Sequence, residues 1–345
     1  MDFGLTDEQD QLAAAERAWF TKNDPVARIR ATLDAAAVTV DPAARAHADE
    51  SGLLALLTPE MGGTHVDLAV VTEEHGYAAS SLPIADLNIA TWLLDSVGVP
   101  GADGALVGLT RGPKGDTDGT ALRLSGVSSP MPMAADMDSV ALAGQVGERE
   151  YLVVLSAPRR SAMATLDLTR SWGRLDLDTT VDEWTELPTG TLARLRDALA
   201  VHRAIDALGA AARLLDMTVS YAGQREQFGA PIGSFQAVKH HCADMAVAVE
   251  ASRASLWAAA LALDTASDAA SSPVASLAPA RTRAVSAAAA YAKSAASRVA
   301  GTALQVHGGI GFTWEHDLHL FLRRIKVDEA FDGTVAEHRA ALVTA

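Results

Sequence analysis

Two segments in the second half of the chain carry residue types that can hold a phosphate-bearing ligand. The first runs from Arg225 to Gln236 and reads Arg-Glu-Gln-Phe-Gly-Ala-Pro-Ile-Gly-Ser-Phe-Gln. Its arginine is a permanently charged fork that can bind a phosphate group through two hydrogen bonds. The second runs from Gln305 to Phe312 and reads Gln-Val-His-Gly-Gly-Ile-Gly-Phe. Its glycines let backbone amides approach an anion without interference from side chains.

Either segment alone is weak evidence, but the two lie about 80 residues apart, each flanked by helix-like sequence. In this order and spacing they resemble the flavin-holding half of an acyl-CoA dehydrogenase. The second segment runs on to Phe331-Asp-Gly-Thr334, as it does in that family. The resemblance implies that FAD is the cofactor and that Arg225 and Phe228 contact it from a neighbouring subunit. The cofactor-binding residues that it implies are Arg225, Gln227, Phe228, Phe235, Gln236, Gln305, Val306, His307, Gly308, Gly309 and Thr334.

Each of these residues also has a plainer interpretation. Arg225 can be a surface arginine paired with Glu226 or Asp244, and the glycines can form a simple helix C-cap and turn. His307 and His316 are interpreted as structural residues, because no cysteine or carboxylate partner shares a recognisable zinc spacing with them. The sequence therefore predicts no metal site.

The reaction that the resemblance implies is α,β-dehydrogenation of an acyl-CoA thioester, in which a carboxylate removes the α-proton and the β-hydrogen leaves as hydride. Such a base must reach the α-carbon from a largely dry pocket. In the commonest branch of the family the base is a Glu directly before Gly-Thr, and Asp332 stands at that position here. The exchange shortens the reach by about 1.5 Å, and misplacements of that size can reduce catalysis strongly. A nitroalkane oxidase branch is similar in using Asp at this point.

A second branch, which includes heteromeric enzymes that shorten steroid side chains, takes its base from the helix before the Arg-x-x-Phe-Gly segment. Asp206, surrounded by Ala, Ile and Leu, is the acidic residue nearest to that position. Its alternative interpretation is an exposed polar residue, or an aspartate paired with Arg203 or Arg213 at helical spacing. Asp206 and Asp332 are thus the two candidate catalytic residues.

The composition limits the class of protein. The chain has 345 residues, with 28 basic and 43 acidic side chains and a net charge of −15, so its electrostatics favour neither nucleic acid nor an anionic membrane. No segment reaches about 18 uninterrupted apolar residues. The single cysteine, Cys242, excludes an intramolecular disulfide and is interpreted as a small buried hydrophobe. Because the N-terminus also lacks the features of a secretory signal, we expect a cytoplasmic protein.

Hydrophobic periodicity predicts which elements position these residues. From Thr6 to about Val97 the pattern is helical, with Thr6 and Gln9 at the spacing of a capping box. Short apolar runs broken by turn residues follow, and the clearest strands are 139–144 and 150–156. Helical patterns return over 192–224, 235–266, 274–306 and 319–330.

The prediction is a mainly α protein with the acyl-CoA dehydrogenase architecture. It consists of an N-terminal helical domain (1–100), a small, reduced β domain (101–188) and a C-terminal four-helix bundle that binds FAD (189–345). The β domain is expected to be a barrel or sandwich, since it is short and rich in turns and lacks a dinucleotide-binding fingerprint.

The β domain departs from the family. Ordinary members carry Thr-Glu-Pro-Gly-Ala-Gly-Ser-Asp and Trp-Ile-Thr-Asn segments there, and neither occurs in this chain, whose matching region runs from Leu124 to Asp138. The chain thus retains the half of the FAD site that is donated across a subunit interface. We therefore expect one subunit of a heteromeric (α2β2) acyl-CoA dehydrogenase, passing electrons to an electron-transfer flavoprotein and acting on a bulky acyl-CoA such as a steroid side chain. The alternatives are a non-catalytic subunit that completes a partner's FAD site, and a nitroalkane oxidase that uses Asp332.

Overall fold

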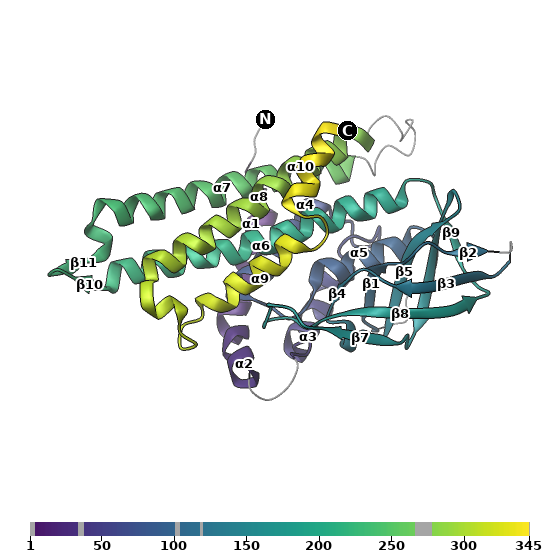
Figure 1. Cartoon of the computed structure of the whole chain (residues 1–345), viewed down its shortest axis with the longest axis horizontal. Helices are drawn as coiled ribbons and strands as arrows, with labels where there is room; N and C mark the ends of the chain where they lie inside the picture. The colour runs from purple at the N-terminus through teal and green to yellow at the C-terminus, as the bar shows by residue number, and fades with distance from the viewer. Residues whose placement is uncertain (1–3, 34–37, 101–103, 118–119, 266–277, 345) are drawn as a thin grey trace.

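The computed structural model describes residues 4–33, 38–100, 104–117, 120–265 and 278–344. Helices come first, strands follow, and helices return, as Figure 1 shows. The first helices are α1 (Asp7–Asn23), α2 (Pro25–Thr32), α3 (Pro42–Glu50), α4 (His65–Ala78) and α5 (Ile84–Asp95). The C-terminal helices are α6 (Thr191–Gln224), α7 (Gln236–Thr265), α8 (Ala278–His307), α9 (Leu318–Ala330) and α10 (Val335–Thr344). The predicted mainly α fold with a middle β region is confirmed.

The first helix begins where its sequence predicts. The Thr6 hydroxyl accepts a hydrogen bond from the Gln9 backbone N–H, and the Gln9 side chain accepts one from the Thr6 N–H. This capping box satisfies two donors that the helix itself leaves without partners. Within the stretch predicted to be helical, α4 and α5 lie on either side of residues 80–83.

The middle region is a pair of small sheets. One has the strand order β1 (Val107–Arg111), β5 (Ser139–Val146), β6 (Arg149–Ser156), β9 (Thr185–Leu187). The other has the order β2 (Asp116–Thr117), β3 (Leu122–Val127), β8 (Trp172–Val181), β4 (Met131–Pro132), with β7 (Arg160–Met163) also paired to β8. Only β1 and β5 pair in parallel among the described strands. This arrangement agrees with the two predicted strands and with a turn-rich β unit.

The long helices α6, α7 and α8 lie side by side, with α9 against α6 and α8 (Figure 1). At the end of the bundle far from the sheets, α6 and α7 are joined by a hairpin of β10 (Glu226–Gln227) and β11 (Ala230–Pro231). Among the described residues, α7 alone is long and apolar enough to cross a membrane by length and composition. One such helix is weak evidence for a membrane span, because the core helix of a helical bundle passes the same test. Cys242 on α7 is only half-buried, which corrects its interpretation as a core residue.

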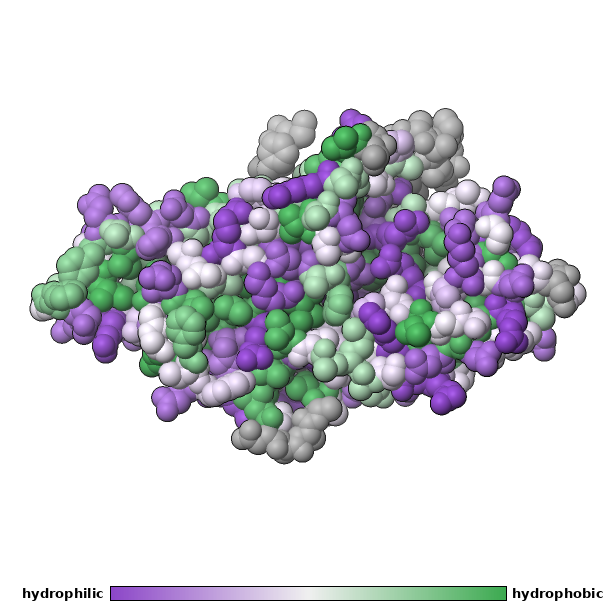
Figure 2. Space-filling view, in the orientation of Figure 1, coloured by the Kyte–Doolittle hydropathy of each residue, from purple (hydrophilic) through white to green (hydrophobic). Residues whose placement is uncertain are grey.

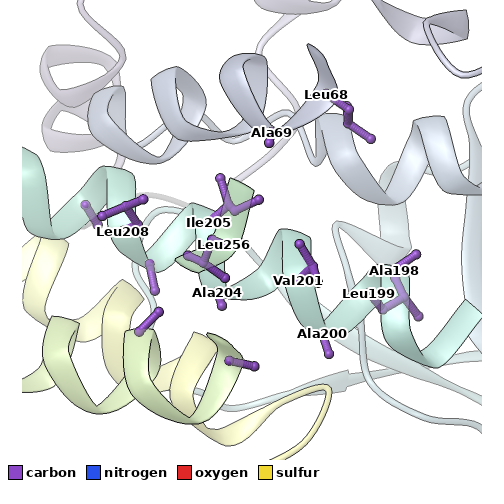
Figure 3. Close-up of a cluster of buried hydrophobic side chains, with 14 of the residues drawn as sticks. Leu68, Ala69, Ala198, Leu199, Ala200, Val201, Ala204, Ile205, Leu208 and Leu256 are labelled. Atoms are coloured by element: carbon purple, nitrogen blue, oxygen red, sulfur yellow. The ribbon is translucent and has the colours of Figure 1, made fainter. Parts of the chain in front are cut away.

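The N-terminal helices dock on the bundle through a close crossing of α4 and α6. Leu68 and Ala69 of α4 face the buried side chains of α6, among them Ile205 (Figure 3). At the crossing a Cβ on Gly209 would lie 2.1 Å from the Glu73 carbonyl oxygen. The backbones therefore touch here, and only glycine fits. This contact fixes the rotation of α6, and with it the direction in which the candidate acid Asp206 points.

Gly209→Ala is expected to destabilise the protein by about 3 kcal/mol, because the added methyl group forces the two helix backbones apart. Gly301→Ala in α8 is the matched control. No atom lies within 4 Å of its added Cβ, so we expect no loss, and a gain of about 0.5 kcal/mol from helix propensity. Chemical denaturation of both variants measures the difference. Equal stability of the two variants would contradict the close crossing.

Candidate functional site

The Arg225 segment projects from the bundle as an exposed arm. Arg225 ends α6 with its N–H bonded to the Tyr221 carbonyl, and its own carbonyl accepts from the Ile232 N–H. Phe228 is 94% exposed and has a left-handed backbone with φ of 55°. Its ring lies edge to face with that of Phe235, at 6.1 Å between centroids. Apart from this ring contact, the side chain is left almost entirely in solvent by a strained backbone, which indicates a contact outside the described chain.

Arg225, Gln227 and Gln236 are exposed as well. Among the ion pairs of the described residues none involves Arg225, so the alternative pairing with Glu226 or Asp244 is not present. The Gln227 amide donates to the carbonyl of Glu226, and the Gln236 amide lies 3.5 Å from His240 Nε2. The guanidinium of Arg225 is therefore available to an anion.

The Gln305 segment lies next to this arm. The ring of His307 at the end of α8 stacks on that of Tyr221 in α6, at 4.5 Å between centroids. His307 Nδ1 lies 2.8 Å from the Ala303 carbonyl, while Nε2 is buried without a partner in the described chain. Burial lowers the pKa of His307, which keeps the imidazole neutral at pH 7. The structure thus brings together two segments that are 80 residues apart in the sequence.

The glycines after His307 leave the backbone open. Gly308 has φ of 61°, and a Cβ on Gly308 or Gly309 would meet no atom within 4 Å. They form a short 3-10 helix, Gly308–Phe312, rather than a simple turn. Hydrophobic side chains are exposed at this end of the molecule, and Figure 2 shows green surface there among polar residues. These are Phe228, Phe235, Ile310, Phe312 and Trp314. An arginine fork, a glycine backbone with open space beside it and aromatic faces fit the adenine and pyrophosphate part of FAD.

Asp206, the first candidate base, lies in a buried ion pair. Both of its oxygens accept from Arg324 of α9, at 2.7 Å to Nε and 2.7 Å to Nη2. Arg170, from the loop before β8, adds a contact of 3.3 Å. Its ion-pair partners are therefore distant residues, and not Arg203 or Arg213 as the helical spacing suggested.

These contacts oppose a role in proton abstraction. Burial pushes the pKa of Asp206 upwards, but Arg170 and Arg324 outweigh it and hold the pKa far below the usual value of an aspartate. A general base at neutral pH works best with a pKa near the operating pH. The assignment of Asp206 as base stays a prediction that this geometry disfavours.

Asp332, the second candidate, lies in the loop between α9 and α10. Three cationic side chains contact this loop. Arg203 Nε donates to Asp332 Oδ2 at 3.1 Å, and Arg111 Nη2 lies 3.6 Å from Oδ1. Lys293 Nζ donates to the carbonyls of Phe331, at 2.7 Å, and Gly333, at 2.6 Å. Asp332 itself has φ of 54°, an uncommon value for a residue with a side chain. The contacts of Lys293 and Arg203 hold this conformation in place.

A pocket of about 390 Å³ opens beside this loop. Its polar lining residues are Arg111, Arg196, Asp197, Thr282, Ser286, Asp332, Glu337 and His338. Thr334 lies at its edge and caps α10, since its hydroxyl and N–H both donate to the Glu337 carboxylate. Thr334 therefore has a structural partner in the described chain, and its proposed contact with a cofactor stays a prediction.

Sequence reasoning missed Lys293, Arg111 and α10. Lys293 has 0% exposure, although it lies in a helix whose sequence is rich in alanine. The available signal was the helical spacing of Lys293 from Ala289 and Ala296. This spacing places the three residues on one face of α8, and that face is buried. For α10 the signal was Thr334 followed by Glu337, the spacing of a capping box. We find no local signal for Arg111.

Comparison with known proteins adds an independent finding. The family described as "Acyl-CoA dehydrogenase, C-terminal domain" matches residues 194–344. The chain is 33% identical over 280 residues to "Acyl-CoA dehydrogenase IpdE2" of Mycobacterium tuberculosis, covering 80% of this chain and 77% of that protein. Its fold is similar to a chain of the ChsE4-ChsE5 complex of Mycobacterium tuberculosis, with a TM-score of 0.86 and 24% identity over 100% of this chain and 98% of that one. The fold is also similar to a structure named Tcur3481-Tcur3483 steroid ACAD, with a TM-score of 0.83 and 23% identity. This match covers 98% of this chain and 97% of that one.

Lys293→Met is expected to lower the free energy of unfolding by about 2 kcal/mol, because two loop carbonyls lose a charged donor while the aliphatic stem is kept. The control is Lys326→Met on α9, whose exposed ammonium pairs with Glu329 at the surface. Its cost should stay below about 1 kcal/mol. Urea denaturation of both variants tests this. If the Lys293→Met protein is as stable as the control, Lys293 does not stabilise the loop.

Proposed function

Because the chain belongs to the acyl-CoA dehydrogenase family, whose members are oxidoreductases, we propose that it acts as one subunit of a heteromeric, FAD-dependent acyl-CoA dehydrogenase. The observation that carries this proposal is the exposed arm at the end of the bundle. Arg225 and Phe228 point away from the described chain, so the cofactor that they would bind must be held mainly by another subunit. The similarity to a complex of two named components, ChsE4 and ChsE5, supports two different chains.

In this arrangement Arg225 binds the pyrophosphate, and the open space beside Gly308 and Gly309 lets the cofactor approach the backbone closely. Phe228 and Phe235 cover the cofactor with apolar surface, and Gln227, Gln236 and Gln305 offer amide groups at the rim. His307 presents its unpartnered Nε2, and Val306 contributes apolar contact. FAD supplies the hydride acceptor when bound.

The substrate class follows from the relatives and not from residues of the pocket. A steroid ACAD among the similar structures supports a bulky acyl-CoA such as a steroid side chain. An electron-transfer flavoprotein is the proposed electron acceptor, since one of the similar folds comes from a structure of such a protein's system. A single cysteine in the chain supports a reducing compartment, the cytoplasm.

A second candidate function is favoured by the ion pairs of the two acids. If Asp206 and Asp332 both serve as structural anchors, the partner supplies the base and this chain completes the cofactor site without taking part in proton transfer. The same contacts weigh against a nitroalkane oxidase that uses Asp332, because both oxygens of its carboxylate already face Arg203 and Arg111.

Arg225→Ala is expected to reduce FAD affinity of the co-expressed complex by about tenfold to a hundredfold, the value of a lost charge-assisted hydrogen bond. Arg159→Ala, an exposed arginine of the β region, is the matched control and should leave affinity unchanged. Flavin absorbance against protein concentration gives the stoichiometry, for which we expect one FAD per two chains. One FAD in each chain, or full occupancy in the Arg225→Ala complex, would reject the shared site.

Asp332→Asn is expected to retain the turnover of the complex with acyl-CoA, because the amide keeps the loop contact and the partner supplies the base. Steady-state kcat is measured beside the unfolding midpoint. A loss of about a hundredfold or more in kcat at unchanged stability would instead establish Asp332 as the base. Anaerobic flavin bleaching by acyl-CoA but not by a nitroalkane is expected in the same complex, and the reverse result would favour the oxidase.

A further inference from the structure

Asp328 on α9 is fully enclosed, with 0% exposure. Its Oδ1 accepts from Arg170 Nη2 at 2.8 Å. Its Oδ2 has no donor in the described chain. The carboxylate of Asp206 lies within hydrogen-bonding reach of Asp328 and can complete this side. Two carboxyl groups in contact cannot both be acceptors only, since each then lacks a proton for the other.

The charges of the inner cluster point the same way. Three carboxyl groups, those of Asp167, Asp206 and Asp328, meet two guanidinium groups, those of Arg170 and Arg324. All five side chains are buried. With every acid ionised, these five side chains alone would carry a net charge of −1 out of contact with water, which is costly unless neighbouring cations offset it. One added proton removes that charge.

The surrounding cations do not supply the missing donor. Arg203 on α6 donates to Asp86 of α5 at 2.8 Å and to Asp332 at 3.1 Å. Lys293 on α8 directs its ammonium to two backbone carbonyls. His75 on α4 is buried next to Arg324, and burial lowers its pKa to about 3, so it is neutral. None of these groups therefore donates a hydrogen bond to Asp328 Oδ2.

We propose that Asp328 is a neutral carboxylic acid in the folded protein and that it donates its proton in a hydrogen bond to the Asp206 carboxylate. With this proton in place, the negative charges of Asp167 and Asp206 balance the positive charges of Arg170 and Arg324, so that Arg170 can be buried in the bundle. Arg170 then binds Asp167, Asp206 and Asp328 at once and fastens the loop before β8 to α6 and α9. Burial raises the pKa of Asp328 well above its ordinary value, against the pull of Arg170, as the assignment requires.

The shared proton also affects the position of the candidate site, because packed side chains link Arg170 to the Asp332 loop. Trp172, two residues after Arg170, packs on Phe331 with 4.6 Å between ring centroids. Phe331 precedes Asp332 and accepts one of the two hydrogen bonds from Lys293. Asp328 is therefore a positioning residue, which sets the place of the Asp332 loop through Arg170 and Trp172. This role does not depend on the proposed function, because it concerns the fold of the chain itself.

Infrared spectroscopy of the full-length chain at neutral pH tests the protonation directly. We expect the carbonyl stretch of a buried carboxylic acid in the unmodified protein and its loss in Asp328→Asn. Because the first measurement needs no variant, the proposal remains testable if a variant fails to fold. Absence of the band from the unmodified protein at neutral pH would overturn the proposal.

Stability supplies a second, independent readout. Asn is neutral and keeps an N–H donor, so Asp328→Asn should hold the wild-type unfolding midpoint at pH 7. Asp206→Asn, the matched control in the same cluster, leaves Arg324 and Arg170 without their shared carboxylate and should lower the midpoint by about 10 °C or more. If Asp328→Asn falls as far as Asp206→Asn, Asp328 is an ionised partner of Arg170 and the proposal is wrong.

The pH dependence has a defined sign. A carboxyl group whose pKa is raised by folding binds its proton more tightly in the folded state, so stability falls as pH rises above about 4. We expect the unfolding midpoint of the unmodified protein to fall more steeply between about pH 5 and pH 9 than that of Asp328→Asn. Lys293, with a folded pKa of about 8, contributes the opposite slope above that pH in both proteins and cancels in the comparison. Equal slopes would contradict the shared proton.

Discussion

The buried contact between Asp206 and Arg324 is the interaction on which the other parts of this structure depend. It joins α6 to α9, and the remaining nitrogen of Arg324 donates to Ser80 at the turn after α4 and to Thr169 in the loop before β8. One guanidinium therefore connects the N-terminal helices, the β region and the bundle. A buried ion pair adds little net stability compared with apolar packing, but losing one partner costs about 3 to 5 kcal/mol. Its main effect is to permit only one arrangement of the three parts.

This arrangement divides the candidate functional residues into two groups. The aspartates, which resemble catalytic bases by type and position, are bound by arginines that join distant parts of the chain. The arm around Arg225 and Phe228 has no such partners in the described chain and remains exposed. Side chains that bind a ligand must keep their hydrogen bonds and apolar faces available, whereas side chains that hold domains together must use them. The division is what a subunit that lends half of a cofactor site requires.

Local sequence patterns predicted most of the elements. The capping box at Thr6, the helices on either side of 80–83 and the strands that became β5 and β6 all follow from rules that act over a few residues. The same rules explain the failures. A short helix, α10, was overlooked although Thr334 and Glu337 mark its start, and Cys242 was placed in the core because residue type alone does not tell which face of α7 is covered.

By itself, the sequence determined the order of helices and strands, the family, and the segments proposed to bind a phosphate-bearing cofactor, because each is encoded in residues close together in the chain. Only the tertiary structure showed which side chains the two candidate acids contact. Asp206 meets Arg324 across 118 residues and Asp332 meets Arg203 across 129, and no local spacing predicts such pairs. The basicity of a carboxylate depends on the charges and the burial around it, and those are set only when distant helices pack together.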